Sequence, residues 1–507
     1  MAEMKHYTLG EYVKLLEEKG MLAEYDLQGK DGEEIKLLTY DSREVTQGTL
    51  FICKGAAFKA EYLKNSMNQG AVCYVSEKKY ELEKEVPYIL VKGIRDAMAV
   101  LANFFYNKPW EDLAVIGFGG TKGKSTSTYY MKAVVDDYLA AQDKPESAVI
   151  STIDIYDGKS KVESHITTPE AVELQMHLRN ALDCNIEYAE MEISSQALKY
   201  GRVDEMQFDV SVFLNISEDH ISPIEHPDFE DYFQSKMKMF EKSKTAVVNL
   251  DADYIDQILE ASKAAGEVVT FSTKNPEADY YAYNIYKEGK DIRFSVKCEA
   301  FDEEFVLTMP GFFNVENALG VVAASVKLGI PTEYIHSGLR RARSSGRMEF
   351  YHSKDHEVMA IVDYAHNKLS FEKLFSAMKE EFPDYGLVAI FGCPGKKSLL
   401  RRKYLGTIAG QYSKMVYLVA EDPGYEPVED ISKEIAQYVE AQKCPYKMIE
   451  DRGEAIKDAI ETAEGKTLLL VTGKGAETRQ KYGCEYLDCP SDVEYVQRYL
   501  AEYDSRH

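Results

Sequence analysis

The chain has 507 residues, 45% of them hydrophobic, so it is long enough for two to four domains with substantial cores. Its 85 acidic and 60 basic side chains give a formal net charge of −25, which argues against a nucleic-acid backbone or an anionic membrane surface as a partner. No apolar run approaches the ~20 residues that a membrane span needs.

Cysteine usage indicates the compartment. The eight cysteines form no CxxC pair, and the opening residues MAEMKHYTLGEY carry no export signal. This is typical of reduced thiols rather than of a disulfide or zinc framework. We therefore expect a soluble, cytoplasmic protein, and we expect it to be a monomer.

The first hundred residues predict a small α/β domain. Strand-like runs occur at KLLTYDSR (36–43), TLFICKG (49–55) and AVCYVSE (71–77), with a helical segment around EYLKNSMNQG (61–70). A helix-like stretch, GIRDAMAVLANFFYN (93–107), ends before Lys108-Pro109, because proline disfavours helix in the residue before it. The first predicted domain is therefore residues 1–108.

A glycine-rich loop between a strand and a helix marks the second predicted domain. LAVIGF (113–118) is an apolar run of strand length, and it leads into GFGGTKGKSTSTYYMKAV (117–134). This order is typical of a strand, phosphate loop and helix in a parallel sheet. Residues 109–344 are predicted to form this doubly wound domain, with further strands at SAVIST, YAEMEIS, VSVFLNIS and TAVVNL and a closing helix at NVENALGVVAASVKLGI.

A second alternation of apolar strands and helices predicts a third domain, residues 345–507. Its strands are expected at EVMAIVDYA, YGLVAIFG, MVYLVAED and TLLLVTGKG. The predicted fold class is thus α/β with three domains: a small N-terminal domain, a central P-loop ATPase-like parallel sheet, and a C-terminal Rossmann-like domain.

The loop residues suit a phosphate. Gly120 and Gly123 allow backbone amides to approach phosphate oxygens at a helix start, and Lys124 and Ser125 suit the β- and γ-phosphates and Mg²⁺. The strict GxxxxGK[ST] pattern is not met, because Phe118 stands at its first position. A glycine-rich turn with an incidental lysine is the alternative.

Two further strands end in polar groups. Glu192 ends one apolar run, and Asp219 and His220 follow another. Ligands bind at the carboxyl ends of strands in open α/β sheets, so these groups are candidates to hold a divalent cation near Ser125. Taken singly, each is equally compatible with a helix cap or a hydrogen-bonded strand end.

Nine segments in order resemble the Mur ligase family, closest to its MurE type. They run from about Asp41 to Asp492 and read GFGGTKGKST, HITTPE, MEISSQALKYGRV, NISEDH, DYFQSKMKMF, PGFFNVENALG, GRMEFY, VDYAHN and VTGKGAE. MurE-type enzymes add an amino acid to UDP-N-acetylmuramoyl-L-alanyl-D-glutamate. The family converts a substrate carboxylate into an acyl phosphate with ATP, and an amine then displaces phosphate. The resemblance therefore implies ATP and Mg²⁺ as cofactors, with the nucleotide-sugar dipeptide and a free amino acid as partners.

The resemblance also implies roles for individual residues. Ser125, Glu192, His220 and Lys236 would serve two magnesium sites, with Lys236 carried as a carbamate that reverses its charge. Without the resemblance, Lys236 reads as an ordinary surface lysine. The catalytic set would be Lys124, Glu192, His220 and Lys236. The ATP-binding set would be Gly120, Thr121, Lys122, Gly123, Lys124, Ser125, Thr126, Asn317 at the adenine, and Arg347, Asp363 and His366 from a C-terminal domain that closes over ATP.

Substrate contacts follow in the same way. Ser42 and Arg43 of DSREV resemble uridine-diphosphate contacts. The residues that resemble the groups holding the muramoyl peptide are Thr167, Thr168, Ser194, Ser195 and Arg202. TTPE alone is also a common helix start, and both readings can hold together.

The segment EDPGYEP (421–427) departs from the DNPR motif of diaminopimelate-adding enzymes. Asp422 and Gly424 replace its asparagine and arginine, so a distal carboxylate loses its bidentate partner and would be repelled by Asp422 or Glu426. We therefore expect L-lysine, with L-ornithine or another basic residue as alternatives. Arg402 resembles the residue that holds the α-carboxylate, and Gly473 and Glu477 those at the amine end.

Other departures leave alternatives open. Ala476 stands where a histidine is usual, Ser195-Gln196 replaces a serine-histidine pair, and FGCPGKKSLLRRK has lysines in place of an aspartate and an arginine. The alternatives are the same reaction with meso-diaminopimelate or another amino acid, and a paralogue that binds the nucleotide sugar without turnover.

Overall fold

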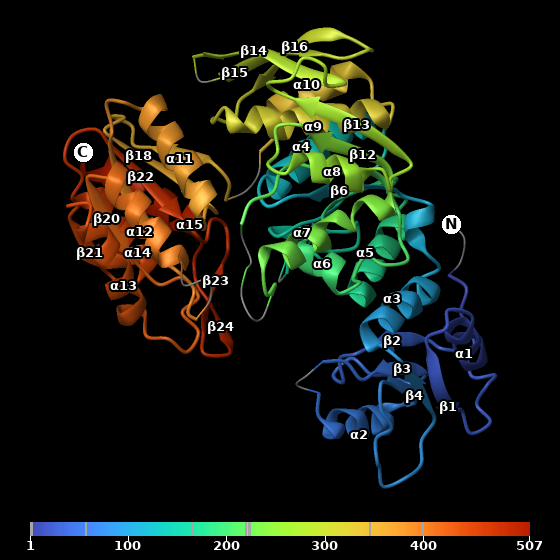
Figure 1. The fold of residues 1–507 in the computed structure, drawn as a ribbon. Helices are drawn as coiled ribbons and strands as arrows, with labels where there is room; N and C mark the ends of the chain where they lie inside the picture. Colours follow the sequence, from blue (N-terminus) through green and yellow to red (C-terminus); the bar gives the residue numbers. More distant parts are fainter. Residues whose placement is uncertain are drawn as a thin grey trace.

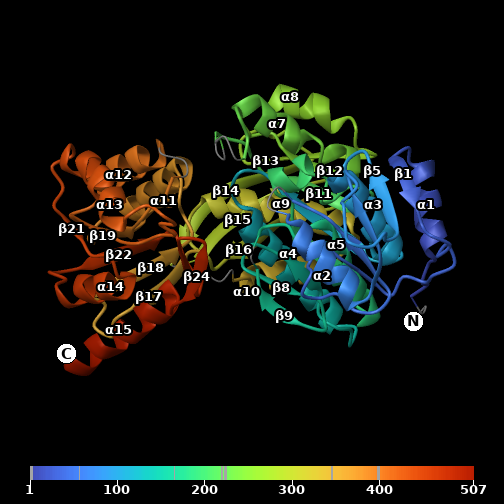
Figure 2. The same cartoon turned by 90° about the horizontal axis from the view of Figure 1, so that it is seen from below.

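The computed structural model describes residues 4–55, 58–164, 166–218, 221, 225–289, 291–343, 346–396 and 400–507. Three units follow one another along the chain, coloured blue, teal to yellow, and orange to red in Figure 1. The N- and C-termini lie on opposite sides of the molecule in both views (Figure 2). None of the helices in the described ranges is both long and apolar enough to cross a membrane.

The N-terminal unit is a sheet with helices packed against it. Its elements are α1 (Leu9–Glu18), β1 (Leu22–Asp26), β2 (Leu37–Thr39), β3 (Thr49–Ile52), α2 (Ala60–Gln69), β4 (Ala71–Ser76), β5 (Tyr88–Val91) and α3 (Ile94–Phe105). The strand order is β1-β5-β4-β3-β2, and only β1 runs antiparallel to its neighbour. The strands predicted at 36–43, 49–55 and 71–77 are β2, β3 and β4.

The middle unit carries the predicted phosphate loop. Its elements are η1 (Pro109–Glu111), β6 (Ala114–Gly119), α4 (Lys124–Ala140), β7 (Ala148–Ile150), β8 (Asp154–Tyr156), β9 (Lys161–Glu163), α5 (Ala171–Asp183), β10 (Tyr188–Glu192), α6 (Ser195–Lys199), β11 (Phe208–Phe213), α7 (Phe229–Met237), η2 (Phe240–Lys242), β12 (Ser243–Asn249), α8 (Ile255–Ser262), β13 (Glu267–Ser272), β14 (Tyr280–Glu288), β15 (Asp291–Lys297), β16 (Asp302–Leu307), α9 (Phe313–Lys327) and α10 (Thr332–Arg341).

The sheet of the middle unit is parallel at its centre and antiparallel at both edges. Its order is β16-β15-β14-β13-β12-β11-β6-β10-β7-β8-β9, with parallel pairing from β14 to β7. Successive residues of β6 point to opposite faces. Ile116 and Phe118 pack with α4, α9 and α10, whereas Val115 packs with α5, α6 and α8. Helices therefore cover both faces, as the doubly wound prediction requires.

The C-terminal unit contains a second mostly parallel sheet. Its elements are β17 (Glu349–His352), β18 (Val358–Asp363), α11 (Lys368–Glu381), β19 (Gly386–Phe391), α12 (Leu400–Tyr412), β20 (Met415–Leu418), α13 (Val428–Glu440), β21 (Tyr446–Met448), α14 (Arg452–Glu461), β22 (Thr467–Thr472), β23 (Arg479–Tyr482), β24 (Glu485–Asp488) and α15 (Asp492–Arg506). The order is β17-β18-β22-β19-β20-β21, and β23 and β24 form a separate hairpin. The three-domain α/β fold class is confirmed.

The predicted boundaries fall between these sheets. The position between residues 108 and 109 separates α3 from η1. The position between 344 and 345 lies outside the described residues. The exact limits of the three domains stay a prediction.

Candidate functional site

The loop between β6 and α4 has the backbone that an anion cradle needs. Gly120 and Gly123 adopt φ values of 134° and 85°, which favour glycine. A Cβ added to Gly123 would lie 2.2 Å from Oδ1 of Asn317, so a side chain does not fit there. Lys124 is the first residue of α4, and its Nζ donates to the carbonyls of Gly120 (3.0 Å) and Thr121 (3.1 Å). The lysine therefore bends back over the loop at the positive end of a helix.

Lys236 lies against the same loop. It sits in the last turn of α7, only 3% exposed, and its Nζ donates to the carbonyl of Gly120 at 2.8 Å. The preceding turn holds the helix in place, because the Tyr232 hydroxyl is 2.8 Å from Oγ1 of Thr121 and its ring faces Nζ of Lys236 at 4.9 Å. This burial excludes the reading of Lys236 as an ordinary surface lysine.

The other candidate metal ligands lie at neighbouring strand ends. Glu192 ends β10, which pairs with β6, and its carboxylate accepts hydrogen bonds from the backbone and hydroxyl of Thr152 at 2.8 and 3.1 Å. The Ser125 hydroxyl accepts from Arg347 of the C-terminal unit at 3.1 Å. His220 and Asp219 lie outside the described residues. The oxygen ligands at Ser125 and Glu192, on one edge of the sheet beside the loop, fit Mg²⁺.

A cavity of about 110 Å³ beside the loop, here called the loop pocket, gathers residues of both units. Asp363 accepts backbone hydrogen bonds from Met348 (3.0 Å) and Ala365 (2.7 Å), and burial raises its pKa. The Arg347 guanidinium lies over the Tyr364 ring at 4.4 Å. Of the predicted ATP-binding set, the loop pocket is lined by Lys122, Gly123, Thr126, Asn317, Arg347, Asp363 and His366.

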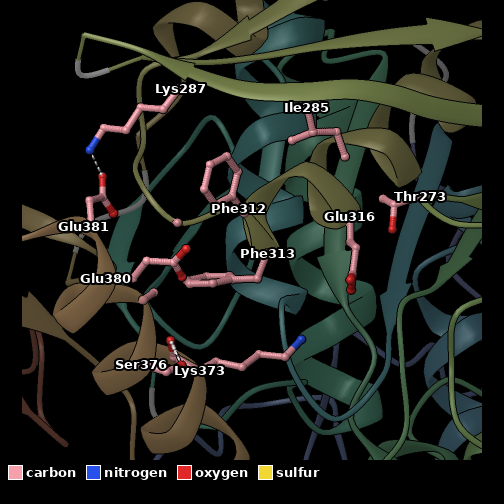
Figure 3. Close-up of a pocket in the computed structure, with 12 residues that line it drawn as sticks. Thr273, Ile285, Lys287, Phe312, Phe313, Glu316, Lys373, Ser376, Glu380 and Glu381 are labelled. Carbon is pink, nitrogen blue, oxygen red and sulfur yellow. Dashed lines mark hydrogen bonds and ion pairs between the residues drawn. The ribbon is translucent and has the colours of Figure 1, made fainter. Parts of the chain in front are cut away.

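A larger cavity of about 570 Å³, the hairpin pocket, adjoins the loop pocket and shares Phe313, Glu316 and Lys373 with it. Figure 3 shows it between β14 and α11, with Lys287 of β14 reaching Glu381 of α11. Residues of both the middle and the C-terminal units line each of these two pockets.

A third cavity of about 330 Å³, the central pocket, is lined by Lys124 and by residues of both units. The C-terminal unit contributes Asp422, Glu477, Arg479 and Tyr486 to its wall. The middle unit contributes Lys124, Thr152, Ser164, Thr167, Ser194, Ser195, Arg202 and Lys236. The structure therefore brings together the phosphate-loop lysine, the buried lysine and most of the predicted muramoyl-peptide residues.

The wall of the central pocket is held by a short chain of polar contacts. Thr168 is fully buried, and its hydroxyl donates to the carbonyl of Glu192 at 2.9 Å. Arg202 donates to the carbonyl of Thr168 at 3.1 Å and pairs with Glu170 at 2.8 Å. Lys54 of the N-terminal unit also pairs with Glu170, at 2.8 Å. Thr168 therefore helps to position Arg202, which lines the pocket, without lining the pocket itself.

Ser42 and Arg43 lie in the N-terminal unit, apart from the pockets described above. The Arg43 side chain is 87% exposed and pairs with Asp41. Two residues before Ser42, the Tyr40 hydroxyl donates to Glu173 of α5, so this segment is attached to the middle unit.

The fourth cavity, of about 410 Å³, is the C-terminal pocket. The predicted residues Asp422, Gly473 and Glu477 line it. Lys474 pairs with Asp422 (3.0 Å) and Glu477 (2.5 Å); burial opposes its charge, but these carboxylates raise its pKa. Two of the acidic groups expected to attract an ammonium are thus already paired with a lysine.

Arg402 and Glu426 are not among the described residues that line the C-terminal pocket, and their predicted roles stay a prediction. Arg402 is 1% exposed and binds Glu426 through two hydrogen bonds (2.9 and 2.7 Å) and Glu434 at 2.5 Å. Its hydrogen bonds lower the pKa of Glu426. The neighbouring Arg401 lines the C-terminal pocket instead.

Glu421 is a residue of the C-terminal pocket that sequence reasoning missed. It is 7% exposed, and in the described part of the chain its Oε2 has no hydrogen-bond partner. Burial raises its pKa to about 7. A Cβ on Gly473 would come within 2.2 Å of Oε2, so glycine at 473 leaves room for this carboxylate. Its place directly after an apolar strand was the available signal.

The middle and C-terminal units touch around these pockets. Besides the Arg347–Ser125 contact, the Thr478 hydroxyl donates to Glu163 at 2.8 Å. Arg479 donates to the carbonyl of Ser164 at 3.2 Å. The start of the hairpin of β23 and β24 therefore docks on the end of β9 and on the residue that follows it.

Two family models match the chain. The Mur ligase middle domain matches residues 119–325, and the Mur ligase, glutamate ligase domain matches residues 346–475. A UDP-N-acetylmuramoyl-L-alanyl-D-glutamate--L-lysine ligase of Enterococcus faecalis is 38% identical over 88% of both chains. A UDP-N-acetylmuramyl-tripeptide synthetase of Lactobacillus acidophilus is 31% identical over 98% of both chains.

Solved structures share the architecture at lower identity. A UDP-N-acetylmuramoyl-L-alanyl-D-glutamate--2,6-diaminopimelate ligase superposes with a TM-score of 0.66 and 22% identity, covering 99% of this chain and all of that chain. MurF from Thermotoga maritima, solved in complex with ADP, gives a TM-score of 0.61 and 17% identity over 93% and 98% of the two chains. These likenesses concern the fold.

Proposed function

This chain belongs to the Mur ligase family, and we propose that it is an ATP-dependent, ADP-forming ligase of peptidoglycan synthesis. It adds a basic amino acid, L-lysine, to the D-glutamate of UDP-N-acetylmuramoyl-L-alanyl-D-glutamate. The observation that carries the proposal is the central pocket, which Lys124 and Lys236 line together with Glu477 of the C-terminal unit. One cavity is thus lined both by the phosphate-loop lysine and by the domain proposed to bind the amino acid. This arrangement suits a reaction that activates a carboxylate with ATP and joins it to an amine.

The first half-reaction is phosphoryl transfer from ATP to the D-glutamate carboxylate. The loop amides, Lys124 and Arg347 hold the phosphates, and Arg347 is aimed at charge that builds during transfer. Asn317, next to Gly123, contacts the adenine end of the nucleotide. Ser125, Glu192, His220 and a carbamylated Lys236 would hold Mg²⁺, which supplies charge stabilisation at the transferring phosphate.

Carbamylation resolves a difficulty at Lys236. A buried ammonium is costly, and this one lies within 2.8 Å of a loop carbonyl at the phosphate cradle. Reaction of the neutral amine with carbon dioxide gives an anionic carbamate with two oxygen ligands. That change converts a competitor for the phosphate site into a group that suits a hard divalent cation.

In the second half-reaction, the amine displaces phosphate from the acyl phosphate in the central pocket. Thr167, Ser194 and Arg202 position the dipeptide, while Ser42 and Arg43 of the N-terminal domain, residues 1–108, bind the uridine diphosphate. Residues 109–344 bind ATP, and residues 345–507 bring the amino acid. Contacts such as Thr478–Glu163 hold the C-terminal domain over the pocket and exclude water from the acyl phosphate.

The choice of amino acid rests on the C-terminal pocket. Arg401 suits the α-carboxylate, because Arg402 is committed to Glu426 and Glu434. Glu421 offers a distal ammonium a buried oxygen, Oε2, for which the described residues provide no hydrogen-bond partner. Gly424 leaves no guanidinium for a distal carboxylate. Lysine therefore fits better than meso-diaminopimelate.

One experiment tests the proposal. Purified protein is incubated with ATP, Mg²⁺ and UDP-N-acetylmuramoyl-L-alanyl-D-glutamate, and ADP release is measured against a panel of amino acids, with Lys124→Ala as the inactive control. We expect turnover with lysine. Turnover with meso-diaminopimelate alone would overturn the selectivity, and no turnover with any amino acid would favour a non-catalytic paralogue. Gel filtration in the same buffer tests the expected monomer.

A further inference from the structure

Ser195, His226 and Asp231 are connected by hydrogen bonds, and Ser195 lines the central pocket. Nε2 of His226 lies 3.0 Å from Oγ of Ser195, and Nδ1 lies 2.6 Å from a carboxylate oxygen of Asp231. His226 is fully buried, and Ser195 is 4% exposed and lines the pocket. The histidine comes from the segment before α7, 31 residues after the serine.

The hydrogen-bond geometry determines where the protons lie. Lys199 pairs with Asp231 at 2.6 Å, and this hydrogen bond, followed by that from His226, lowers the pKa of Asp231. An ionised carboxylate only accepts, so Nδ1 of His226 carries a proton. In the neutral ring Nε2 then accepts from the Ser195 hydroxyl. The lone pairs of Oγ are left to face the central pocket, as in other serine–histidine–carboxylate arrangements.

Glu225, Asp422 and Glu477 also line the central pocket, and each of them already has a polar partner. Lys474 pairs with Asp422 at 3.0 Å and with Glu477 at 2.5 Å, and the Gln196 side chain donates to Glu225 at 3.4 Å. Ser195 lines the same cavity as these groups and the loop lysine Lys124, and in the proposed reaction the amine and the acyl phosphate meet in this cavity.

We propose that Ser195, His226 and Asp231 are a proton relay for the incoming amine, an inference that rests on the proposed function. As the amine nitrogen bonds to the acyl carbon, the bond from that carbon to the phosphate oxygen breaks and inorganic phosphate leaves with the electron pair. The nitrogen gives a proton to Oγ of Ser195, and the hydroxyl proton of Ser195 passes to Nε2 of His226. Asp231 holds the ring in orientation and stabilises the imidazolium. Ser195 touches the amine; His226 and Asp231 are positioning residues.

The test separates the two half-reactions with hydroxylamine. This nucleophile is uncharged at neutral pH and traps an acyl phosphate as a hydroxamate without a protein base. Ser195→Ala and His226→Gln are compared with wild type for lysine-dependent ADP release and for hydroxamate formation. We expect a fall in lysine-dependent kcat of roughly 10²- to 10⁴-fold in both variants, and in His226→Gln we expect hydroxamate formation and the KM for the nucleotide sugar to stay unchanged.

His177→Gln is the matched control, because His177 makes a similar buried pair with Asp157 at 2.7 Å in α5. It should change neither activity. Hydroxamate formation also reports folding of each variant, and Ser195→Ala removes a single oxygen. Equal loss of both activities, or lysine-dependent kcat at the wild-type level, overturns the relay. Absence of hydroxamate with wild type refutes the proposed function itself, and the relay with it.

Discussion

Glu421 gives the sharpest prediction about the choice of amino acid. Replacing it with glutamine keeps the size of the side chain and removes the buried charge whose Oε2 lacks a partner in the described structure. A hydrogen bond between charged groups contributes about 1.5–3 kcal/mol, so the variant should lose roughly 10- to 150-fold in kcat/KM for lysine. Norleucine, which lacks only the distal amine, should lose nothing. The preference for lysine over norleucine should therefore collapse in Glu421→Gln.

The same residue predicts a pH dependence with a definite sign. Burial raises the pKa of Glu421 to about 7, so ionisation rises across the neutral range. The ionised fraction increases about tenfold between pH 6 and 8, and kcat/KM for lysine relative to norleucine should rise with it. ADP release with each amino acid across this range measures the effect.

Glu429→Gln controls for charge removal in the same region, since Glu429 pairs with Lys433 on the exposed surface of α13. It should leave the preference and its pH profile unchanged. A Glu421→Gln enzyme that retains the wild-type preference for lysine over norleucine would refute the assignment of the distal ammonium to Glu421.

Three further predictions concern the loop and the core. Lys236→Ala should lower ADP release by roughly 10²- to 10³-fold, with partial rescue by short carboxylic acids that replace the carbamate; unimpaired activity would contradict its role. Arg347→Ala should lower kcat on the order of 10³-fold with little effect on the KM for lysine, measured as ADP release at saturating ATP. Burial raises the pKa of Glu190 to about 8, so the folded protein favours the neutral carboxyl group. The contribution of Glu190 to the free energy of unfolding is therefore complete below about pH 4.5 and is lost as the pH rises through 8. The Tm of wild type relative to Glu190→Gln should fall between pH 5 and 8, and a constant difference would argue against this ionisation.

The parallel strands were predictable because they are buried on both faces. β6 and β22 read as nearly continuous apolar runs, β10 and β11 are mostly apolar apart from residues such as Glu190 and Asp209, and the structure has strands at each of them. The antiparallel extension β14–β16 was not predicted. Its strands are half-exposed, with alternating burial in β15, and whether such a segment joins a sheet depends on pairing that no local pattern records.

The site was predicted less completely. Loop and strand-end residues such as Lys124 and Glu192 could be placed, because their positions follow from the sequence of strand and helix. Arg401 and Arg402 are adjacent on a helix and differ by about 100° in direction, so the sequence does not say which one faces the pocket. His226 reaches Ser195 only through the packing of α6 and α7, which no spacing rule brings together.

The hairpin of β23 and β24 links specificity to domain docking. Thr478 and Arg479 make the contacts with Glu163 and Ser164, and Glu477 and Tyr486 of the same short segment line both the central and C-terminal pockets. Any displacement of the hairpin therefore moves the docking surface and the amino-acid pocket as one body. Amino-acid specificity and domain docking are therefore coupled in evolution. Substitutions in this segment that change which amino acid is bound must also preserve the contacts between the middle and C-terminal units.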